Sequence, residues 1–333
     1  MITNASAEQA VQGGAGLDGI QATPGAPAPG GNAASAERPE PDTREIRTVG
    51  VIGSGTMGTG IAIVVARAGF RVVVLDTRAE ALDNAREQAA AFLRKSVERG
   101  RLKPGQDERI LANWHGTTQL ADMAGCDLVI EAVFEDLGVK HELFSRLNAV
   151  CPPHTIFASN TSTISITEIA GGSGRPDRVV GMHFCLPAQL MKLVEMSPGL
   201  CTSSDVFRQA WDFCEALGQI PVNTRDTPGF ILNYFLIPWH NDVINMVDQG
   251  VAEPADIDLA VKTALGYPLG PLELLDMVGM DTQLLLSEAM YGLTNEPRAA
   301  CPPLVKRMIG AHKLGRKSGE GFHRYDSDNI FGA

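Results

Sequence analysis

Three glycines are spaced for holding phosphate groups. Gly53, Gly55 and Gly58 form the pattern Gly-x-Gly-x-x-Gly directly after the apolar segment TVGVI, which predicts a buried strand. The residues that follow have helical character, and a second strand-like segment then ends in Asp76. In this context the first glycine permits a tight turn, the second lets the backbone approach a pyrophosphate, and the third lets the helix pack closely on the strand. The pattern therefore predicts a dinucleotide-binding site.

The residues around the glycines indicate which dinucleotide is expected. Thr56 and Met57 open the predicted helix, so their backbone N–H groups and the positive end of the helix dipole would face the phosphates. Asp76 would accept hydrogen bonds from the adenosine ribose, and its charge would repel a 2′-phosphate. NAD is therefore expected rather than NADP, although the neighbouring Arg78 could attract such a phosphate.

Strand-like and helix-like segments alternate along the first two thirds of the chain. Such alternation predicts βαβ units and therefore a Rossmann-type, doubly wound parallel sheet. The further predicted strands are RVVVLD, CDLVIEAV, TIFASN and RVVGMHF, and the further predicted helices include residues 79–101 and GVKHELFSRLNAV.

The pattern changes after Asp226. Thr227-Pro228 is typical of a helix N-cap followed by proline at the first helical position, and a long apolar helix then runs through Pro238, where a kink is expected. Further helical segments follow, without a convincing strand. We therefore expect three parts: an Ala/Gly/Pro-rich, disordered tail (1–44), an α/β nucleotide-binding domain (45–226) and an all-α C-terminal domain (227–333).

The composition argues against several classes of partner. A formal net charge of −11 leaves no broad basic surface for nucleic acid or an anionic membrane. No apolar run reaches the roughly 18–20 residues of a membrane-spanning helix. The six cysteines are scattered without a CxxC pair, and the histidines lack metal-ligand spacing, so neither a disulfide framework nor a metal site is expected. Together with the absence of a signal-like first segment, this predicts a cytoplasmic protein.

Eight motifs occur in order along residues 47–325. They are the glycine pattern, IEAVFEDLGVKHELF from Ile130, ASNTST from Ala158, GMHF from Gly181, MKLVE from Met191, DTPGFILN from Asp226, GYPLGPLELLDMVGMD from Gly266 and GRKSGEGF from Gly315. The set resembles the short-chain L-3-hydroxyacyl-CoA dehydrogenases, including the bacterial 3-hydroxybutyryl-CoA dehydrogenases.

The resemblance implies both an architecture and a reaction. The expected architecture is an NAD-binding Rossmann domain followed by a helical domain for substrate binding and dimerisation, with the active site between them. The expected reaction is the NAD-dependent oxidation of the 3-hydroxyl of an (S)-3-hydroxyacyl thioester, or the reverse reduction. The expected substrate is 3-hydroxybutyryl-CoA or a related short-chain acyl-CoA. A homodimer is also expected, because the apolar helices after Asp226 exceed what a domain of their size easily buries.

The same resemblance assigns the catalytic groups. The catalytic histidine falls on His183 and its glutamate partner on Glu195. Removing a hydroxyl proton needs a base with a pKa near neutrality, which histidine supplies, and a carboxylate on the second ring nitrogen would fix its tautomer. His183 follows the strand-like VVGM, so it is expected at the carboxyl edge of the sheet, where such folds bind ligands. Ser162 and Asn233 match residues that hold the reacting oxygen or the thioester.

Other positions carry over as cofactor or substrate contacts. Glu135 and Lys140 match cofactor-contacting positions, and Asn160 lies in the loop that is expected beside the nicotinamide. Arg99 matches a basic residue that contacts coenzyme A.

Three positions depart from the family pattern. Leu186 stands where asparagine is usual, Tyr234 where arginine is usual, and Phe92 where a small polar residue is expected. These changes are either neutral repacking or a shift in acyl or carrier specificity. Two further functions stay open: the same chemistry on an acyl carrier protein substrate, and a redox-inactive NAD-binding protein, against which the intact catalytic set argues.

The carboxylate of Asp76 generates the first testable prediction. We expect kcat/KM to be higher with NAD than with NADP by about tenfold or more, which corresponds to about 1.4 kcal/mol of unfavourable interaction with the 2′-phosphate. Steady-state kinetics with both cofactors measure the ratio, and Asp76→Asn should narrow it. Equal efficiency with the two cofactors in the wild type would contradict the assignment.

Overall fold

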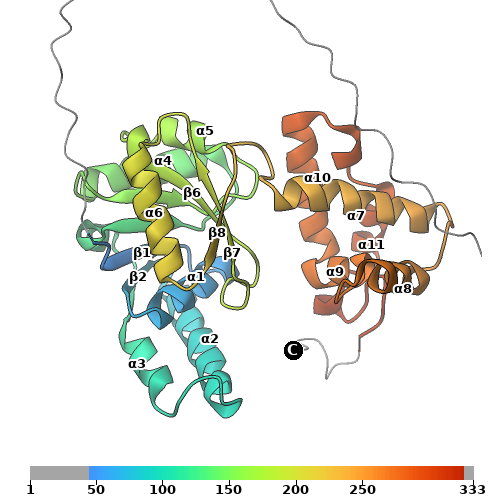
Figure 1. Ribbon diagram of the computed structural model, residues 1–333, viewed down its shortest axis with the longest axis horizontal. Coiled ribbons are helices and arrows are strands. Elements are labelled where there is room, and N and C mark those ends of the chain that lie inside the picture. The colour runs from blue at the N-terminus through green and yellow to red at the C-terminus, as the bar shows by residue number, and fades with distance from the viewer. Residues whose placement is uncertain (1–44, 326–333) are drawn as a thin grey trace, which may run out of the picture. The chain divides into compact units, whose positions relative to one another are not determined.

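An eight-stranded sheet forms the centre of the first part of the chain (Figure 1). The computed structural model describes residues 45–325. The strands follow the order β3-β2-β1-β4-β5-β6-β7-β8. All neighbours pair in parallel except β6 and β7, which are antiparallel. The strands are β1 (Thr48–Ile52), β2 (Arg71–Leu75), β3 (Trp114–Thr117), β4 (Leu128–Glu131), β5 (Ile156–Ser159), β6 (Val179–Phe184), β7 (Leu193–Pro198) and β8 (Ile220–Asn223).

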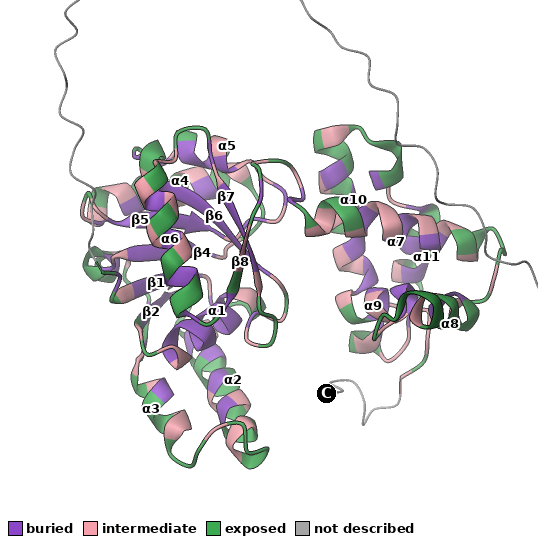
Figure 2. Ribbon diagram, viewed as in Figure 1, coloured by how far each residue is buried: buried purple, intermediate pink, exposed green. Residues whose placement is uncertain are grey.

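Helices cover both faces of this sheet, and each face has its own buried cluster. Side chains of β2 alternate between the two clusters. Val72 and Val74 belong to the cluster that includes residues of α1, α2 and α6, and Val73 belongs to the cluster that includes residues of α4 and α5. Strands buried on both faces have no polar side, which explains their continuous apolar sequences. Figure 2 shows these strands as buried along most of their length. The helices are α1 (Thr56–Arg67), α2 (Ala79–Glu98), α3 (Gln106–Ala112), α4 (Leu137–Val150), α5 (Ile166–Gly171) and α6 (Ser204–Ala216).

The second part of the chain is helical, with no strand among residues 227–325. Its core joins apolar side chains from all five helices, including Val243 and Leu275. The helices are α7 (Leu232–Asp248), α8 (Pro254–Leu265), α9 (Pro271–Val278), α10 (Met280–Thr294) and α11 (Pro303–Gly310). Within the range 45–325, no helix combines the length and apolar character of a membrane-spanning segment.

A buried carboxylate holds the last described residues against this helical part. Asp276, which is 1% exposed, accepts hydrogen bonds from the backbone N–H groups of Phe322 and His323 and from the hydroxyl of Tyr325. A Cβ atom on Gly315 would lie 2.2 Å from the carbonyl oxygen of Asp276. The glycine-rich segment GRKSGEGF therefore follows the surface of α9 closely, and glycine is required where the two backbones approach.

The structure confirms the predicted fold class, a mainly parallel Rossmann-type sheet followed by an all-α part. The antiparallel pairing of β6 with β7 departs from the all-parallel expectation. The predicted helix start at Thr227-Pro228 is wrong, because α7 begins at Leu232 after a turn. In that turn Gly229 and Phe230 have φ of 80° and 49°, which a right-handed helix cannot include. The predicted disordered tail, residues 1–44, lies outside the described residues.

Candidate active site

The glycine loop between β1 and α1 is closely packed at Gly53 and Gly58 and leaves room for a ligand at Gly55. Gly53 has φ of 95°, and a Cβ atom on Gly58 would lie 1.8 Å from the carbonyl oxygen of Gly53, so both positions require glycine. A Cβ atom on Gly55 would meet no heavy atom within 4 Å. Gly55 is the N-cap of α1 and no side chain caps this helix end. The backbone N–H groups of Thr56 and Met57 therefore start a helix whose N-terminus is open to a phosphate.

Asp76 lies beside this loop at the end of β2. Its carboxylate accepts hydrogen bonds from the backbone N–H of Ser54 at 2.9 Å and from the Ser54 hydroxyl at 2.7 Å. Partial burial raises the pKa of Asp76, but these hydrogen bonds and Arg78 outweigh burial and hold the pKa below its ordinary value. An ionised carboxylate at this place fits the ribose-binding role, and the residues present fit NAD.

Antiparallel pairing brings His183 and Glu195 together. The two residues stand directly opposite each other on β6 and β7, so their side chains lie side by side on one face of the sheet. His183 Nδ1 lies 2.7 Å from Glu195 Oε2. The other oxygen of Glu195 accepts hydrogen bonds from the backbone N–H groups of Ile231 and Leu232, each at 2.8 Å. The buried carboxylate thus joins the histidine to the beginning of α7.

These contacts determine the tautomer of His183. Burial raises the pKa of Glu195, but the hydrogen bonds with His183 and with the amides of Leu232 and Ile231 outweigh it, so the net pKa lies below the ordinary value. An ionised carboxylate can only accept hydrogen bonds, so His183 Nδ1 carries the proton. In the neutral imidazole, Nε2 then has a free lone pair, which is the state that a general base requires.

Ser162 faces this lone pair. Its hydroxyl oxygen lies 3.1 Å from His183 Nε2, so the hydroxyl donates to the ring nitrogen. Asn160 accepts a hydrogen bond from the backbone N–H of Phe184 at 2.9 Å, which ties the end of β5 to the end of β6. The ring of Phe230, at 4% exposure, lies 5.7 Å from the His183 ring. The structure thus brings Asn160, Ser162, His183 and Glu195 to one place.

Two other predicted residues support the Ser162 loop. Glu135 Oε1 accepts hydrogen bonds from the backbone N–H of Ser162 at 2.8 Å and from Thr161 and Thr163. Lys140 is 1% exposed and contacts two carboxylates, Glu131 at 2.6 Å and Glu135 at 3.3 Å. Sequence reasoning missed Glu131, Thr161 and Thr163. The available signal for Glu131 was its place as the last residue of the otherwise apolar segment LVIE, at the carboxyl end of a strand.

The remaining predicted substrate residues are exposed or half-buried. Asn233 is half-buried in the first turn of α7, two residues after Ile231. Arg99 is exposed at the C-cap of α2.

The three positions that depart from the family pattern also differ in their surroundings. Leu186 and Tyr234 are 50% and 63% exposed. Phe92 packs against the core on the α1 side of the sheet, so it contributes to packing at that position.

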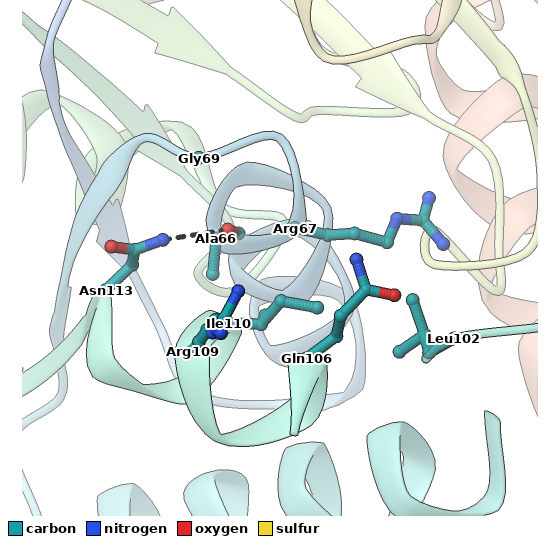
Figure 3. Close-up of a pocket in the computed structure, with 8 residues that line it drawn as sticks. All are labelled: Ala66, Arg67, Gly69, Leu102, Gln106, Arg109, Ile110 and Asn113. Atoms are coloured by element: carbon teal, nitrogen blue, oxygen red, sulfur yellow. Dashed lines mark hydrogen bonds between the residues drawn. The ribbon is translucent and has the colours of Figure 1, made fainter. Parts of the chain in front are cut away.

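A pocket of about 240 Å³ lies elsewhere on the same part of the chain, beside the C-terminal end of α1 (Figure 3). One of its walls is closed by Asn113, which donates a hydrogen bond to the carbonyl of Ala66 at 3.2 Å. None of the predicted site residues lines it. Its lining consists of Ala66, Arg67, Gly69, Leu102, Gln106, Arg109, Ile110 and Asn113.

Comparison with known families covers almost the whole described chain. Residues 48–227 match the model of the 3-hydroxyacyl-CoA dehydrogenase NAD binding domain, and residues 229–325 match that of the 3-hydroxyacyl-CoA dehydrogenase C-terminal domain. The chain belongs to the 3-hydroxyacyl-CoA dehydrogenase family. As a member of this family it is an enzyme, and its cofactor is NAD, as the glycine loop and Asp76 predicted.

Individual relatives agree with this family. A probable 3-hydroxybutyryl-CoA dehydrogenase of Deinococcus radiodurans is 44% identical over 276 residues, which is 83% of this chain and 99% of the relative. The human mitochondrial hydroxyacyl-coenzyme A dehydrogenase is 41% identical over 287 residues, covering 84% of this chain and 91% of the human protein. The crystal structure of (S)-3-hydroxybutyryl-CoA dehydrogenase from Ralstonia eutropha superposes with a TM-score of 0.80 at 36% identity, covering 85% of this chain and 100% of that one.

The buried Glu195 carboxylate generates a prediction about stability and pH. Glu195→Gln replaces one accepting oxygen by an NH2 group, which would face the N–H donors that now bind the carboxylate. We therefore expect it to lower the free energy of unfolding at pH 7 by about 1–3 kcal/mol. Because the folded pKa lies below the ordinary value of 4.5, the stabilisation is fully present above that pH and is lost as pH falls through the folded pKa.

Urea unfolding at neutral pH and at acidic pH checks this. The difference in free energy of unfolding between wild type and variant should be smaller at acidic pH than at neutral pH. Glu142→Gln, at an exposed position of α4, is the control and should change stability little at either pH. A difference that stays constant with pH would contradict a charged Glu195.

Proposed function

We propose that this protein catalyses the NAD-dependent oxidation of the 3-hydroxyl of (S)-3-hydroxyacyl-CoA, and the reverse reduction, with 3-hydroxybutyryl-CoA or a related short-chain thioester. The observation that carries the proposal is the hydrogen-bonded series Ser162–His183–Glu195, in which Nε2 of the histidine is an acceptor. The names of the relatives from Deinococcus radiodurans and Ralstonia eutropha support the same substrate class.

The proposed mechanism follows from the protonation states. His183 Nε2 removes the proton of the substrate hydroxyl, and the C–H bond at the same carbon breaks with its electron pair, which leaves a ketone. Bound NAD supplies the acceptor for that hydride. Glu195 then stabilises the imidazolium, because its negative charge is already hydrogen-bonded to Nδ1. In the reduction, His183 returns the proton to the forming alkoxide.

The other site residues have supporting roles in this proposal. Ser162 and Asn233 hydrogen-bond the reacting oxygen or the thioester carbonyl and orient the acyl chain. The cofactor is held by Gly53, Gly55, Thr56, Met57, Gly58 and Asp76. Glu135 and Lys140 stand at positions that match cofactor-contacting residues of the family, and Asn160 lies beside the nicotinamide. Arg99, exposed on α2, contacts coenzyme A.

We propose three further properties of this protein. The first is the division of the chain at 44/45 and 226/227. The second is the cytoplasmic location, which rests on the cysteine pattern and the composition. The third is the homodimer.

The reaction is tested by NADH consumption with acetoacetyl-CoA, for wild type and for His183→Ala. We expect the wild type to reduce acetoacetyl-CoA. In the variant we expect kcat to be lower by about 10²–10⁴-fold or more, because the general base is removed. NADH binding, followed by nicotinamide fluorescence, should change little, since His183 acts on the proton.

His115→Ala is the matched control, because His115 is an exposed histidine of β3. Turnover of His183→Ala at the wild-type rate would mean that the base is another residue. Activity on an acetoacetyl carrier protein alone would support the carrier alternative. Absence of activity with both substrates would support the redox-inactive alternative.

The dimer proposal is supported by exposed apolar side chains of the helical part. Of the nineteen large apolar side chains exposed within residues 45–325, twelve lie after Asp226. Tyr234, Phe235 and Leu285 are among the most exposed, at 63%, 54% and 68%. A helical part of this size that leaves so much apolar surface in water is typical of a chain that pairs through it.

Light scattering at micromolar concentration measures the mass. We expect twice the chain mass of 35.5 kDa, and a shift toward the monomer in Leu285→Glu, because a carboxylate would be buried without a partner. Leu200→Glu, at a residue 88% exposed after β7, is the control and should leave the mass unchanged. A monomeric wild type would refute the dimer.

A further inference from the structure

A buried ion pair lies beneath the Ser162 loop. Glu131, at the end of β4, is 0% exposed and Lys140, on α4, is 1% exposed. Glu131 Oε1 lies 2.6 Å from Lys140 Nζ and also accepts from the backbone N–H of Val133 at 2.8 Å. Glu131 Oε2 accepts from the hydroxyl of Ser159 at 2.6 Å. Burying both charges costs solvation free energy that the attraction between them often does not recover. Stability alone therefore does not account for this pair.

Lys140 joins this pair to a second carboxylate. Its ammonium lies 3.3 Å from Glu135 Oε2. The other oxygen of Glu135 accepts from the Thr161 hydroxyl at 2.6 Å, from the Ser162 N–H at 2.8 Å and from the Thr163 N–H at 2.9 Å. Three consecutive residues of the loop are therefore fixed by one carboxylate, and that carboxylate is fixed by Lys140.

We infer that Glu131 and Lys140 are positioning residues for the proposed reaction. They hold Glu135 in place, Glu135 holds the loop Thr161–Thr163, and the loop presents the Ser162 hydroxyl to His183 Nε2 at 3.1 Å. The inference rests on the proposed function. It assigns Lys140 a role through Glu135, whereas the family resemblance places Lys140 in direct contact with the cofactor.

The burial of the ammonium supports this indirect role. A side chain that is 1% exposed and occupied by two carboxylates presents little surface to a ligand, while Glu135 has a side chain 37% exposed. Arg146 and Glu142, also on α4, pair with each other on its exposed face. The charged groups in contact with Lys140 are Glu131 and Glu135, so its removal leaves two carboxylates without a cation between them.

The charge balance provides a readout that a merely structural role would not change. Partial burial raises the pKa of Glu135, but Lys140 and then the hydrogen bonds of Thr161, Ser162 and Thr163 outweigh it and hold the pKa below its ordinary value. In Lys140→Met the largest of these opposing effects is lost, so the pKa of Glu135 rises. A protonated Glu135 accepts fewer hydrogen bonds, so the loop should lose its position at a higher pH than in the wild type.

The test compares Lys140→Met, Glu131→Gln and the control Glu142→Gln with the wild type. We measure kcat and KM for acetoacetyl-CoA reduction between about pH 5 and 8, and NADH affinity by fluorescence. We expect Lys140→Met to lower kcat by about 10–100-fold, as displaced catalytic groups do. In this variant the acid limb of the profile of kcat against pH should move to higher pH. The affinity of the variant for NADH should stay near the wild-type value. Glu131→Gln should act in the same direction with a smaller effect, because glutamine keeps the shape of the side chain.

Two results would overturn the inference. One is a wild-type kcat in Lys140→Met. The other is a loss of NADH affinity in Lys140→Met that accounts for its loss of activity while Glu131→Gln behaves as the wild type, which would indicate direct cofactor contact. If Lys140→Met fails to fold, Lys140→Arg, which keeps the cation, and Glu131→Gln answer the same question: wild-type kcat and pH profile in both would overturn the inference.

Failure of the proposed function is recognised separately. An inactive wild type with both thioester substrates would refute the reaction. The position of the loop in a crystal structure of Lys140→Met then decides the inference without turnover: a displaced Thr161–Thr163 loop supports it, and a loop in its wild-type place overturns it.

Discussion

The Glu195 carboxylate is the group on which the proposed site depends most. It lies at 1% exposure and its two oxygens bind different partners, since Oε2 binds His183 and Oε1 binds the first amides at the start of α7. A buried charge is tolerated only when its hydrogen-bonding capacity is filled, so the histidine and the α7 amides are needed to keep it ionised. In return, the ionised carboxylate fixes the proton of the histidine on Nδ1. One side chain thus fixes the tautomer of His183 and binds the backbone at the start of α7.

The reversal of β7 makes this arrangement possible. In a wholly parallel sheet, residues at the carboxyl ends of neighbouring strands belong to βαβ units and arrive from separate crossovers. Here β6 turns back as β7, so a histidine near the end of one strand stands opposite a glutamate near the beginning of the next. The pair belongs to a single ladder, and its spacing is fixed by backbone hydrogen bonds. On the opposite side, Asn160 and the Ser162 loop extend from β5, the parallel neighbour of β6.

The fold class could be predicted from sequence because the parallel strands in the interior of the sheet are buried on both faces and are therefore mainly apolar. The strands β3 (WHGT) and β8 (IPVN) lie at the two edges of the sheet, are four residues long and are only partly buried, so no periodicity marks them. The direction of β7 has no periodic signature either. The predicted start of α7 is too early because Thr-Pro is a good helix-opening signal. No residue type in the sequence marks the positive φ of Phe230, which is buried beside His183. In the site, the motifs located His183 and Glu195, but Glu131 reads from sequence only as the last residue of a strand.

The hydrogen bonds of Asp276 also constrain the order in which the chain can become structured during synthesis. Residues 45–226 contain every strand of the described sheet, so this part is complete while the ribosome is still adding the helices. The helical part is different, because the carboxylate oxygens of Asp276 on α9 stay unfilled until Phe322, His323 and Tyr325 have left the exit tunnel. Its closure must therefore wait for the last residues that the structure describes. Premature termination before that stretch would leave a part that has all the described strands, joined to a helical part in which Asp276 lacks these three hydrogen-bond donors.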